Sequence, residues 1–304
     1  MAGDRRHFRV VAQGKQRQLM TTIYARLRNA PDDAAARLDL ATLLFETPRH
    51  DLVRRHLLRV AGLPKLDWPN ALRLGELLFR LGEFTGARHV LGHCLEHGQI
   101  NYDALLTLSA VQGQLGQPAA AQRSLLAAGR LQPITRPRRI RPEKPNILRL
   151  RSFVGSYLGI RKDSQTGSCR HMLKRGHFSL KHFLGNEGYN LFGVDFAGDN
   201  VARVHEIPPV QLAVNTVSCA DLMSGPLVEI ARFLEGYPNL PIINPPIKVL
   251  ATTRGENYRR LSKSPHVRFP RTFHFTNSGK PVEALARLDA EGLGYPMILR
   301  EAGT

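Results

Sequence analysis

Two arginines and one glycine near the end of the chain are residue types that bind nucleotide phosphates. Arg254, Arg300 and Gly303 lie among short apolar runs that alternate with helical patterns. Fixed cations neutralise phosphate oxygens, and arginine can grip two of them at once. Glycine lets backbone N–H groups approach a phosphate closely. These three residues form the predicted nucleotide-binding set, and no residue is assigned a catalytic role.

Three histidines have a spacing that could suit a metal ion. His89, His93 and His97 lie at i, i+4 and i+8 of one predicted helix. The apolar stripe of the same helix runs through Leu91, which places the histidines on its outer face. No carboxylate follows them at matching spacing, so the interpretation is a solvated surface and no metal site is assigned.

Two other polar positions are weaker candidates for chemistry. Cys219 follows a predicted strand and could act as a nucleophile, but the sequence places no histidine beside it and a half-buried thiol is the commoner case. The segment 154–156 also follows a strand. It could meet a substrate carboxylate, and a tight turn is the preferred interpretation.

The first half of the chain repeats every 34 residues. Two sets of leucines recur at that spacing: Leu40, Leu74 and Leu108, then Leu57, Leu91 and Leu125. Each unit has apolar residues at helical spacing, a turn such as that at Gly82, and a second helical stripe, which predicts a helical hairpin. Such hairpins must stack to bury their apolar faces, so the small residues Gly75 and Ala87 are expected at close helix contacts.

These repeats resemble the tetratricopeptide repeat family, although they lack the usual tryptophan and tyrosine. The residues at the family's signature places are Leu74-Gly75, Leu78, Ala87, Leu91 and Pro133. The resemblance covers roughly residues 34–135 as three units with a half-unit before them. It implies a scaffold whose concave surface binds a protein, a peptide or another part of the same chain, and it implies no catalysis.

From Ile147 onwards strand-like runs alternate with helical stretches, which predicts a parallel, doubly wound sheet with a ligand crevice at the carboxyl ends of its strands. A helix is expected to begin at a Ser224 cap and to close at Gly236. The predicted strands are 147–154, 189–194, 210–216 and 241–243, with a helix over 178–188.

The last part of the chain resembles the start of an ATP-grasp ligase of the glutathione synthetase and glutamate-ligase branch. The resemblance is carried in order by 241–246 (PIINPP), Arg254, the helix 256–263, the strand 267–272 (VRFPRT), a second helix, and 294–304 with Arg300 and Gly303. It implies that both arginines, where the family more often has lysine, and the glycine contact ATP. A complete site also needs a second lobe with Mg²⁺-binding acidic residues. None follows Thr304, so this chain is expected to be a truncated and inactive form.

The sequence thus predicts a multidomain α plus α/β protein. An α-solenoid of helical hairpins spans 1–135, a basic proline-rich linker 136–146, a pre-ATP-grasp α/β domain 147–246, and an incomplete first ATP-grasp lobe 247–304. The main functional hypothesis is a fragment of an ATP-dependent carboxylate-amine ligase that uses ATP and Mg²⁺ when intact, which leaves enzyme status open. The alternative is a non-enzymatic adaptor that binds another protein.

Composition limits the setting and the partners. The net charge of +18 and the pI near 10.6 favour anionic partners, and residues 136–183 hold thirteen Lys or Arg against two acidic residues. Aromatic residues are sparse there, so nucleic acid is not the expected partner. Three scattered cysteines, no apolar leader and no apolar run of membrane length lead us to expect a cytoplasmic protein without membrane contact.

Overall fold

The computed structural model describes residues 17–45, 47, 49–137, 139–178, 180, 188–198, 209–273, 280–294 and 298 of the 304-residue chain. The chain divides into two compact units. The first comprises Met1–Leu131 together with Tyr157–Lys174, and the second comprises Gln132–Ser156 and Arg175–Thr304. Each unit is described by itself.

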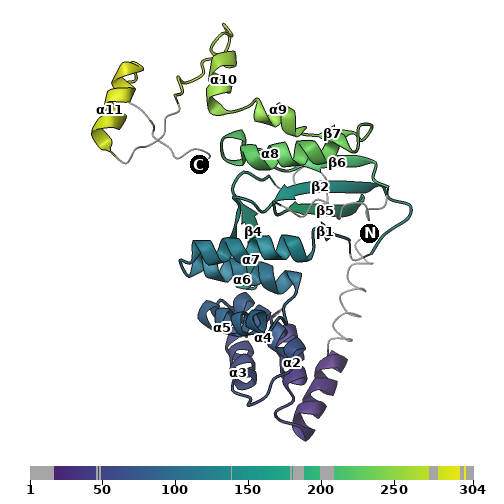
Figure 1. Cartoon of the computed structure of the whole chain (residues 1–304). Coiled ribbons are helices and arrows are strands. Elements are labelled where there is room, and N and C mark those ends of the chain that lie inside the picture. The colour runs from purple at the N-terminus through teal and green to yellow at the C-terminus, as the bar shows by residue number, and fades with distance from the viewer. Residues whose placement is uncertain are drawn as a thin grey trace. The chain divides into compact units, whose positions relative to one another are not determined.

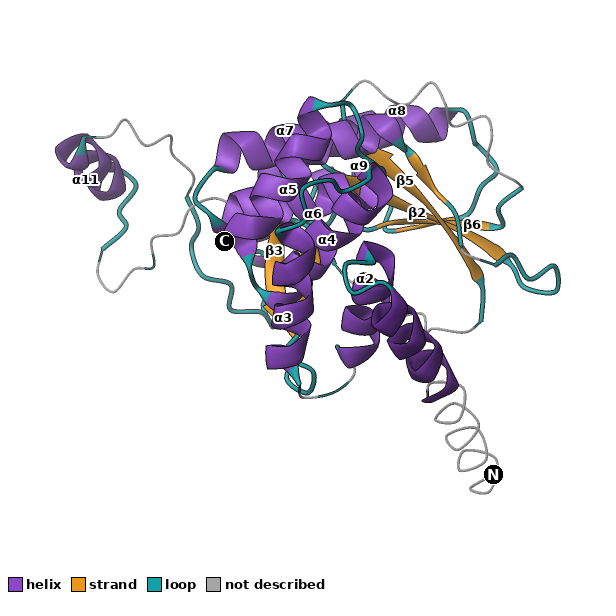
Figure 2. Ribbon diagram, turned by 90° about the horizontal axis from the view of Figure 1, so that it is seen from below, coloured by secondary structure: helices purple, strands orange, loops and turns teal. Residues whose placement is uncertain are grey.

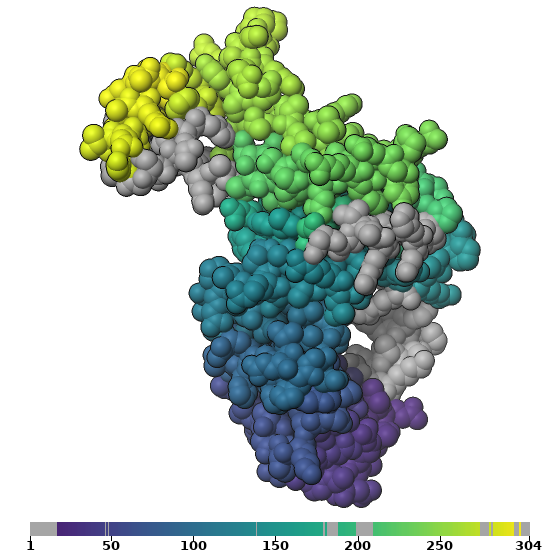
Figure 3. Space-filling view, in the orientation of Figure 1, coloured from purple at the N-terminus to yellow at the C-terminus, as the bar shows by residue number. Residues whose placement is uncertain are grey.

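The first unit is a stack of helical hairpins (Figure 1), and Figure 3 draws the same residues, purple to teal, in space-filling form. Residues 17–29 are helical, and six further helices follow: α2 (Ala34–Leu44), α3 (His50–Ala61), α4 (Trp68–Leu81), α5 (Phe84–Glu96), α6 (Tyr102–Gln114) and α7 (Pro118–Leu131). The first residues of α2, α4 and α6 are 34 positions apart, as are those of α3, α5 and α7. The predicted helical repeat is therefore confirmed at the level of its elements.

Local capping repeats with the same period. The side chains of Asp33, Asp67 and Asn101 each accept a hydrogen bond from the backbone N–H three residues later, at 2.8–2.9 Å. Such N-caps satisfy backbone donors that a helix leaves unpaired. At the other end, Gly82 and Gly116 have φ of +90° and +73°, a conformation that glycine adopts without strain. Sequence therefore fixes where each hairpin starts and turns.

The contact between α4 and α5 depends on a missing side chain, as the sequence predicts. Gly75 and Leu91 are both buried, and a Cβ atom on Gly75 would lie 2.5 Å from Leu91 Cγ and Cδ2. Ala87 is also fully buried on α5. Small residues thus allow the two helices to approach closely.

The first unit also contains a β-hairpin that the sequence analysis missed. Strands β3 (Tyr157–Lys162) and β4 (Cys169–Lys174) pair antiparallel in a two-stranded sheet. They follow residues 132–156, which belong to the second unit, yet they belong with the helices. Figure 2 shows β3 in orange among the purple helices.

The second unit is built on a five-stranded mixed sheet in the order β1-β5-β2-β6-β7. The strands are β1 (Ile134–Thr135), β2 (Asn146–Ser152), β5 (Asn190–Phe196), β6 (Leu212–Asn215) and β7 (Ile242–Ile243). The last four are parallel and β1 is antiparallel to β5 at the edge. The predicted parallel core is confirmed, with an added antiparallel edge strand. The helix expected over 178–188 falls largely outside the described residues.

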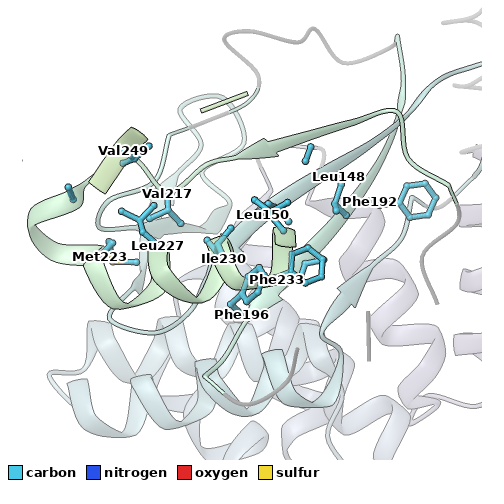
Figure 4. Close-up of a cluster of buried hydrophobic side chains, with 14 residues drawn as sticks. Leu148, Leu150, Phe192, Phe196, Val217, Met223, Leu227, Ile230, Phe233 and Val249 are labelled. Atoms are coloured by element: carbon cyan, nitrogen blue, oxygen red, sulfur yellow. The ribbon is translucent and has the colours of Figure 1, made fainter. Parts of the chain in front are cut away.

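Helix α8 (Ala220–Glu235) covers one face of this sheet (Figure 4). Leu150, Phe196, Leu227 and Ile230 are almost fully buried in the shared core. The expected start of this helix at Ser224 is wrong. The helix begins after Cys219 and kinks at Met223, whose φ and ψ are −122° and 27°; a proline at 226 removes one backbone donor and disturbs the preceding turn.

The chain continues through three short helices beyond the sheet. They are α9 (Pro246–Leu250), α10 (Arg254–Leu261) and α11 (Pro281–Ala290). The strand expected over 267–272 is wrong, because these residues form neither a helix nor a strand. A strand needs a partner for its backbone hydrogen bonds, and within the described residues the sheet ends at β7.

The close approach at Gly75 generates a stability prediction with a matched control. We expect Gly75→Ala to lower the free energy of unfolding by about 1–2 kcal/mol, because overpacking against Leu91 outweighs a helix-propensity gain of about 1 kcal/mol. Gly92, on the neighbouring helix, has open space where its Cβ would be. Gly92→Ala should therefore raise stability by up to about 1 kcal/mol.

The measurement is urea unfolding followed by tryptophan fluorescence, because Trp68 is the single tryptophan of the chain and lies in the helical unit. If the two alanine variants changed stability in the same direction, the packing account of Gly75 would be incorrect.

Candidate functional site

The inner helices of the repeat stack hold the β-hairpin of residues 157–174. Helix α4 packs against β4, and α6 packs against both strands. The ring of Phe79 on α4 lies 6.1 Å from the ring of His171 on β4, measured between centroids. Next to it, Arg80 Nε lies 3.4 Å from Ser168 Oγ. An extended segment thus lies on the first helices of successive hairpins.

The strand register decides which side chains of the hairpin face the helices. Leu158 stands opposite Leu173, and Ile160 opposite His171. Leu158 and Cys169 are 6% and 5% exposed, so both are in the core of the unit. Burial also raises the pKa of the Cys169 thiol. The apolar side of the hairpin is therefore removed from water by the helices.

Helix α6 shows why this cover is needed. Every residue from Ala104 to Val111 is buried. A helix that is buried on all sides must have packing partners on all sides. Helices α7, α5 and α4 contact it, and β3 and β4 contact it as well. The hairpin therefore completes the burial of α6.

Only one residue of the predicted nucleotide set can be placed. Arg254 is the first residue of α10, and its backbone N–H lies 3.4 Å from the Asp221 carboxylate. Arg300 and Gly303 lie outside the described residues. The nucleotide site of Arg254, Arg300 and Gly303 thus stays a prediction, as do its cofactors ATP and Mg²⁺. The ATP-grasp resemblance gains no support from the described fold.

The ligand crevice of such a sheet is expected between β2 and β6. From β2 the chain runs to β5 on one side, and then it crosses back to β6 on the other side. His177 fills this position. Its Nε2 lies 3.0 Å from the Ser152 carbonyl and 3.1 Å from Ser156 Oγ, and its Nδ1 lies 3.5 Å from Thr216 Oγ1. The chain itself therefore occupies the carboxyl ends of these two strands.

The polar residues around His177 have structural partners. The Ser156 hydroxyl donates to the Ser152 carbonyl at 2.8 Å, and Gly155 has a φ of +71°, which confirms the predicted tight turn. On the next strand, Asp195 is fully buried and its carboxylate pairs with Arg151 at 2.6 and 2.7 Å. The sequence pattern around His177, with His171 and His182, indicates a solvated basic face, which is wrong for His177 because its ring is partly buried and hydrogen-bonded between β2 and β6. Asp195 lies in no recognisable motif, and the sequence does not identify it.

The remaining candidates do not converge. Cys219 is half-buried at the start of α8. His89, His93 and His97 are exposed, and the rings of His93 and His97 lie 4.3 Å apart beside Trp68. No group of three or more His, Cys, Asp or Glu suited to a metal ion occurs among the residues that the structure describes.

A cavity of about 550 Å³ lies at the amino ends of the strands. Its lining includes Leu148, Gln211, Tyr237 and Pro241. This edge is opposite to the one where parallel sheets bind ligands. Within the part of the chain that is described, no helix is both long enough and apolar enough to span a bilayer.

Comparison with known proteins adds little. Neither a protein-family model nor a curated protein matches the chain. A crystal structure of MamA aligns with a TM-score of 0.35 and 16% identity, covering 40% of this chain and 71% of that one. The structure of MamA MSR-1 C2 aligns at 0.32 and 21% identity, covering 40% and 70%. Scores this low carry no weight, so the helical-repeat assignment rests on the period and packing described above.

The partly buried position of His177 generates a pH prediction. Burial, only partly opposed by the hydrogen bond to the Ser152 carbonyl, lowers the pKa of His177 from 6.5 to about 4. The folded state disfavours the protonated ring. The neutral His177 ring therefore contributes its full share to the free energy of unfolding above pH 6.5, and this share is lost as the pH falls towards 4. The loss amounts to roughly 3 kcal/mol in the second unit.

We expect His177→Gln to reduce this acid sensitivity, and His93→Gln, on an exposed face, to leave it unchanged. The measurement is urea unfolding at several pH values, with protease-sensitive peptides from β2 and β6 quantified by mass spectrometry. Equal acid sensitivity in wild type and His177→Gln would show that other groups carry it.

Proposed function

We propose that this chain is a non-enzymatic scaffold whose helical repeats bind extended polypeptide segments. The observation that carries the proposal is the seating of the hairpin on α4 and α6, which buries Leu158 and Cys169 against the repeat stack. A helical surface that holds one extended segment in this way has the shape and the apolar character to hold another. The resemblance to tetratricopeptide repeats supports the same interpretation.

The chemistry of the second unit is compatible with a supporting role. The strand ends where a ligand would be expected are filled by His177 and its hydrogen-bonding partners. Asp195, the buried carboxylate nearby, is neutralised by Arg151. Each of these groups has a structural task, which favours the adaptor over the ligase hypothesis.

The proposed binding surface on α4 and α6 can be tested by displacing the hairpin from these helices. In the double variant Leu158→Asp/Leu173→Asp, two carboxylates replace inward-facing apolar side chains, so the hairpin should leave the helices. We expect this variant to bind a fluorescent peptide with the native sequence of residues 157–174, whereas the wild type should not, because its own hairpin occupies the surface. Fluorescence anisotropy measures the binding.

Two controls make the result decisive. A scrambled peptide should not bind, and Trp68 fluorescence should show that the variant remains folded. Rapid modification of Cys169 by a thiol reagent should confirm that the hairpin has left. If a folded variant with a reactive Cys169 ignored the native peptide, the repeats would not be a polypeptide-binding surface. Should the double variant fail to fold, Leu158→Ala provides a milder test.

A titration with Mg-ATP separates the adaptor from the ligase hypothesis. We expect calorimetry to detect no saturable binding by the wild type, and the same result for Arg254→Ala. Saturable binding that the Arg254→Ala substitution abolishes would instead favour the nucleotide site of Arg254, Arg300 and Gly303.

A further inference from the structure

The outward face of the β-hairpin carries a row of cations that the packing of the unit does not require. The register places Tyr157 opposite Lys174, Gly159 opposite Met172 and Arg161 opposite Arg170. Apart from Gly159, these side chains are exposed, with Tyr157 and Met172 at 53% and 37%. The face thus combines three cations with two apolar side chains.

The pairing of Arg161 with Arg170 is unfavourable for the hairpin itself. Like charges directly opposite each other on neighbouring strands repel and destabilise the pair. Asp163 is the only acidic residue of the hairpin sequence, and its carboxylate accepts hydrogen bonds from the turn amides of Gln165 and Thr166. These hydrogen bonds lower the pKa of Asp163, and the charge of Arg170 adds a smaller contribution in the same direction. Across the described ranges, neither arginine forms an ion pair with a carboxylate. A ligand of opposite charge would relieve this repulsion.

We propose that this outward face, formed by Tyr157, Arg161, Arg170, Met172 and Lys174, is a docking site for an acidic, extended segment of a partner protein. The proposal rests on the scaffold function proposed above and names a second surface and a partner class for it. The three rungs extend over about 13 Å, the length of about four extended residues. Acidic side chains at both ends would meet the cations, and an apolar side chain between them would contact Tyr157 and Met172.

The same face is less suited to nucleic acid. Proteins that depend on backbone phosphates typically make about six to ten such contacts, whereas this face offers three cations. Recognition of single strands also uses several aromatic rings in succession, and only Tyr157 is present here. Charge and apolar content together therefore favour a protein segment.

The test uses the full chain at physiological ionic strength with two fluorescent probes. One is a short peptide of alternating glutamate and leucine, and the other is a single-stranded oligothymidylate. We expect the acidic peptide to bind the wild type and to lose affinity by about tenfold or more in Arg161→Glu/Arg170→Glu, because charge complementarity becomes repulsion. Arg161→Lys/Arg170→Lys should largely retain binding.

A matched control changes the net charge equally at another place. Arg88 and Arg123 are exposed on α5 and α7, so Arg88→Glu/Arg123→Glu should leave peptide affinity nearly unchanged. Equal losses in the two double variants would reduce the effect to general attraction by a basic protein and would overturn the proposal. Tighter binding of the oligothymidylate, lost only in the Arg161/Arg170 variant, would reassign the face to nucleic acid.

The single variant Arg161→Glu separates binding from stability. It turns a repulsive cross-strand pair into an attractive one, so the hairpin should be held more firmly and Cys169 should react more slowly with thiol reagents. Peptide binding should nevertheless weaken. A variant that lost both binding and Cys169 protection would indicate a merely structural role and would contradict the proposal. If the acidic peptide fails while the unseated variant still binds the native 157–174 peptide, this docking site is refuted and the scaffold function stands.

Discussion

Burial of the inner face of α6 is the constraint on which the first unit depends. Stacking of helical hairpins buries the apolar side chains that face the neighbouring hairpins. Apolar side chains that point away from these neighbours need another cover. In this protein every residue from Ala104 to Val111 is buried, and that requires β3 and β4 in addition to the surrounding helices. The hairpin is therefore part of the core of the helical unit, although its sequence lies inside the α/β segment.

The same arrangement gives the hairpin two chemically different sides. Because strand side chains alternate between faces, Leu158 and Leu173 face the helices while Arg161 and Arg170 face outwards. Packing against the helices buries the first set, and the second set stays exposed. In the second unit, by contrast, the expected ligand crevice at the carboxyl ends of β2 and β6 is filled. His177 is hydrogen-bonded between these two strand ends.

Much of the fold was accessible from local patterns. The 34-residue period fixed the helical hairpins because apolar spacing, capping residues and turn glycines act within a few residues of one another. Gly75 was identified as a close contact for the same reason. The start of α8 was misplaced because Pro226 lies inside the helix, where a kink at Met223 accommodates it. The strand expected over 267–272 does not form, because a strand needs a neighbouring strand to pair with. A local sequence pattern does not show whether such a neighbour is present.

The sequence by itself determined the repeat stack, the parallel core strands and the strongly basic character of the middle of the chain. Only the tertiary structure decided that residues 157–174 leave the sheet region and cover α6, because that contact joins segments far apart in sequence and depends on the shape of both. It also decided that the side chains of this segment divide between a side packed on the helices, with Leu158 and Cys169, and an exposed side with Arg161 and Arg170. Strand register sets that division, and register follows from which face finds an apolar surface to bury it.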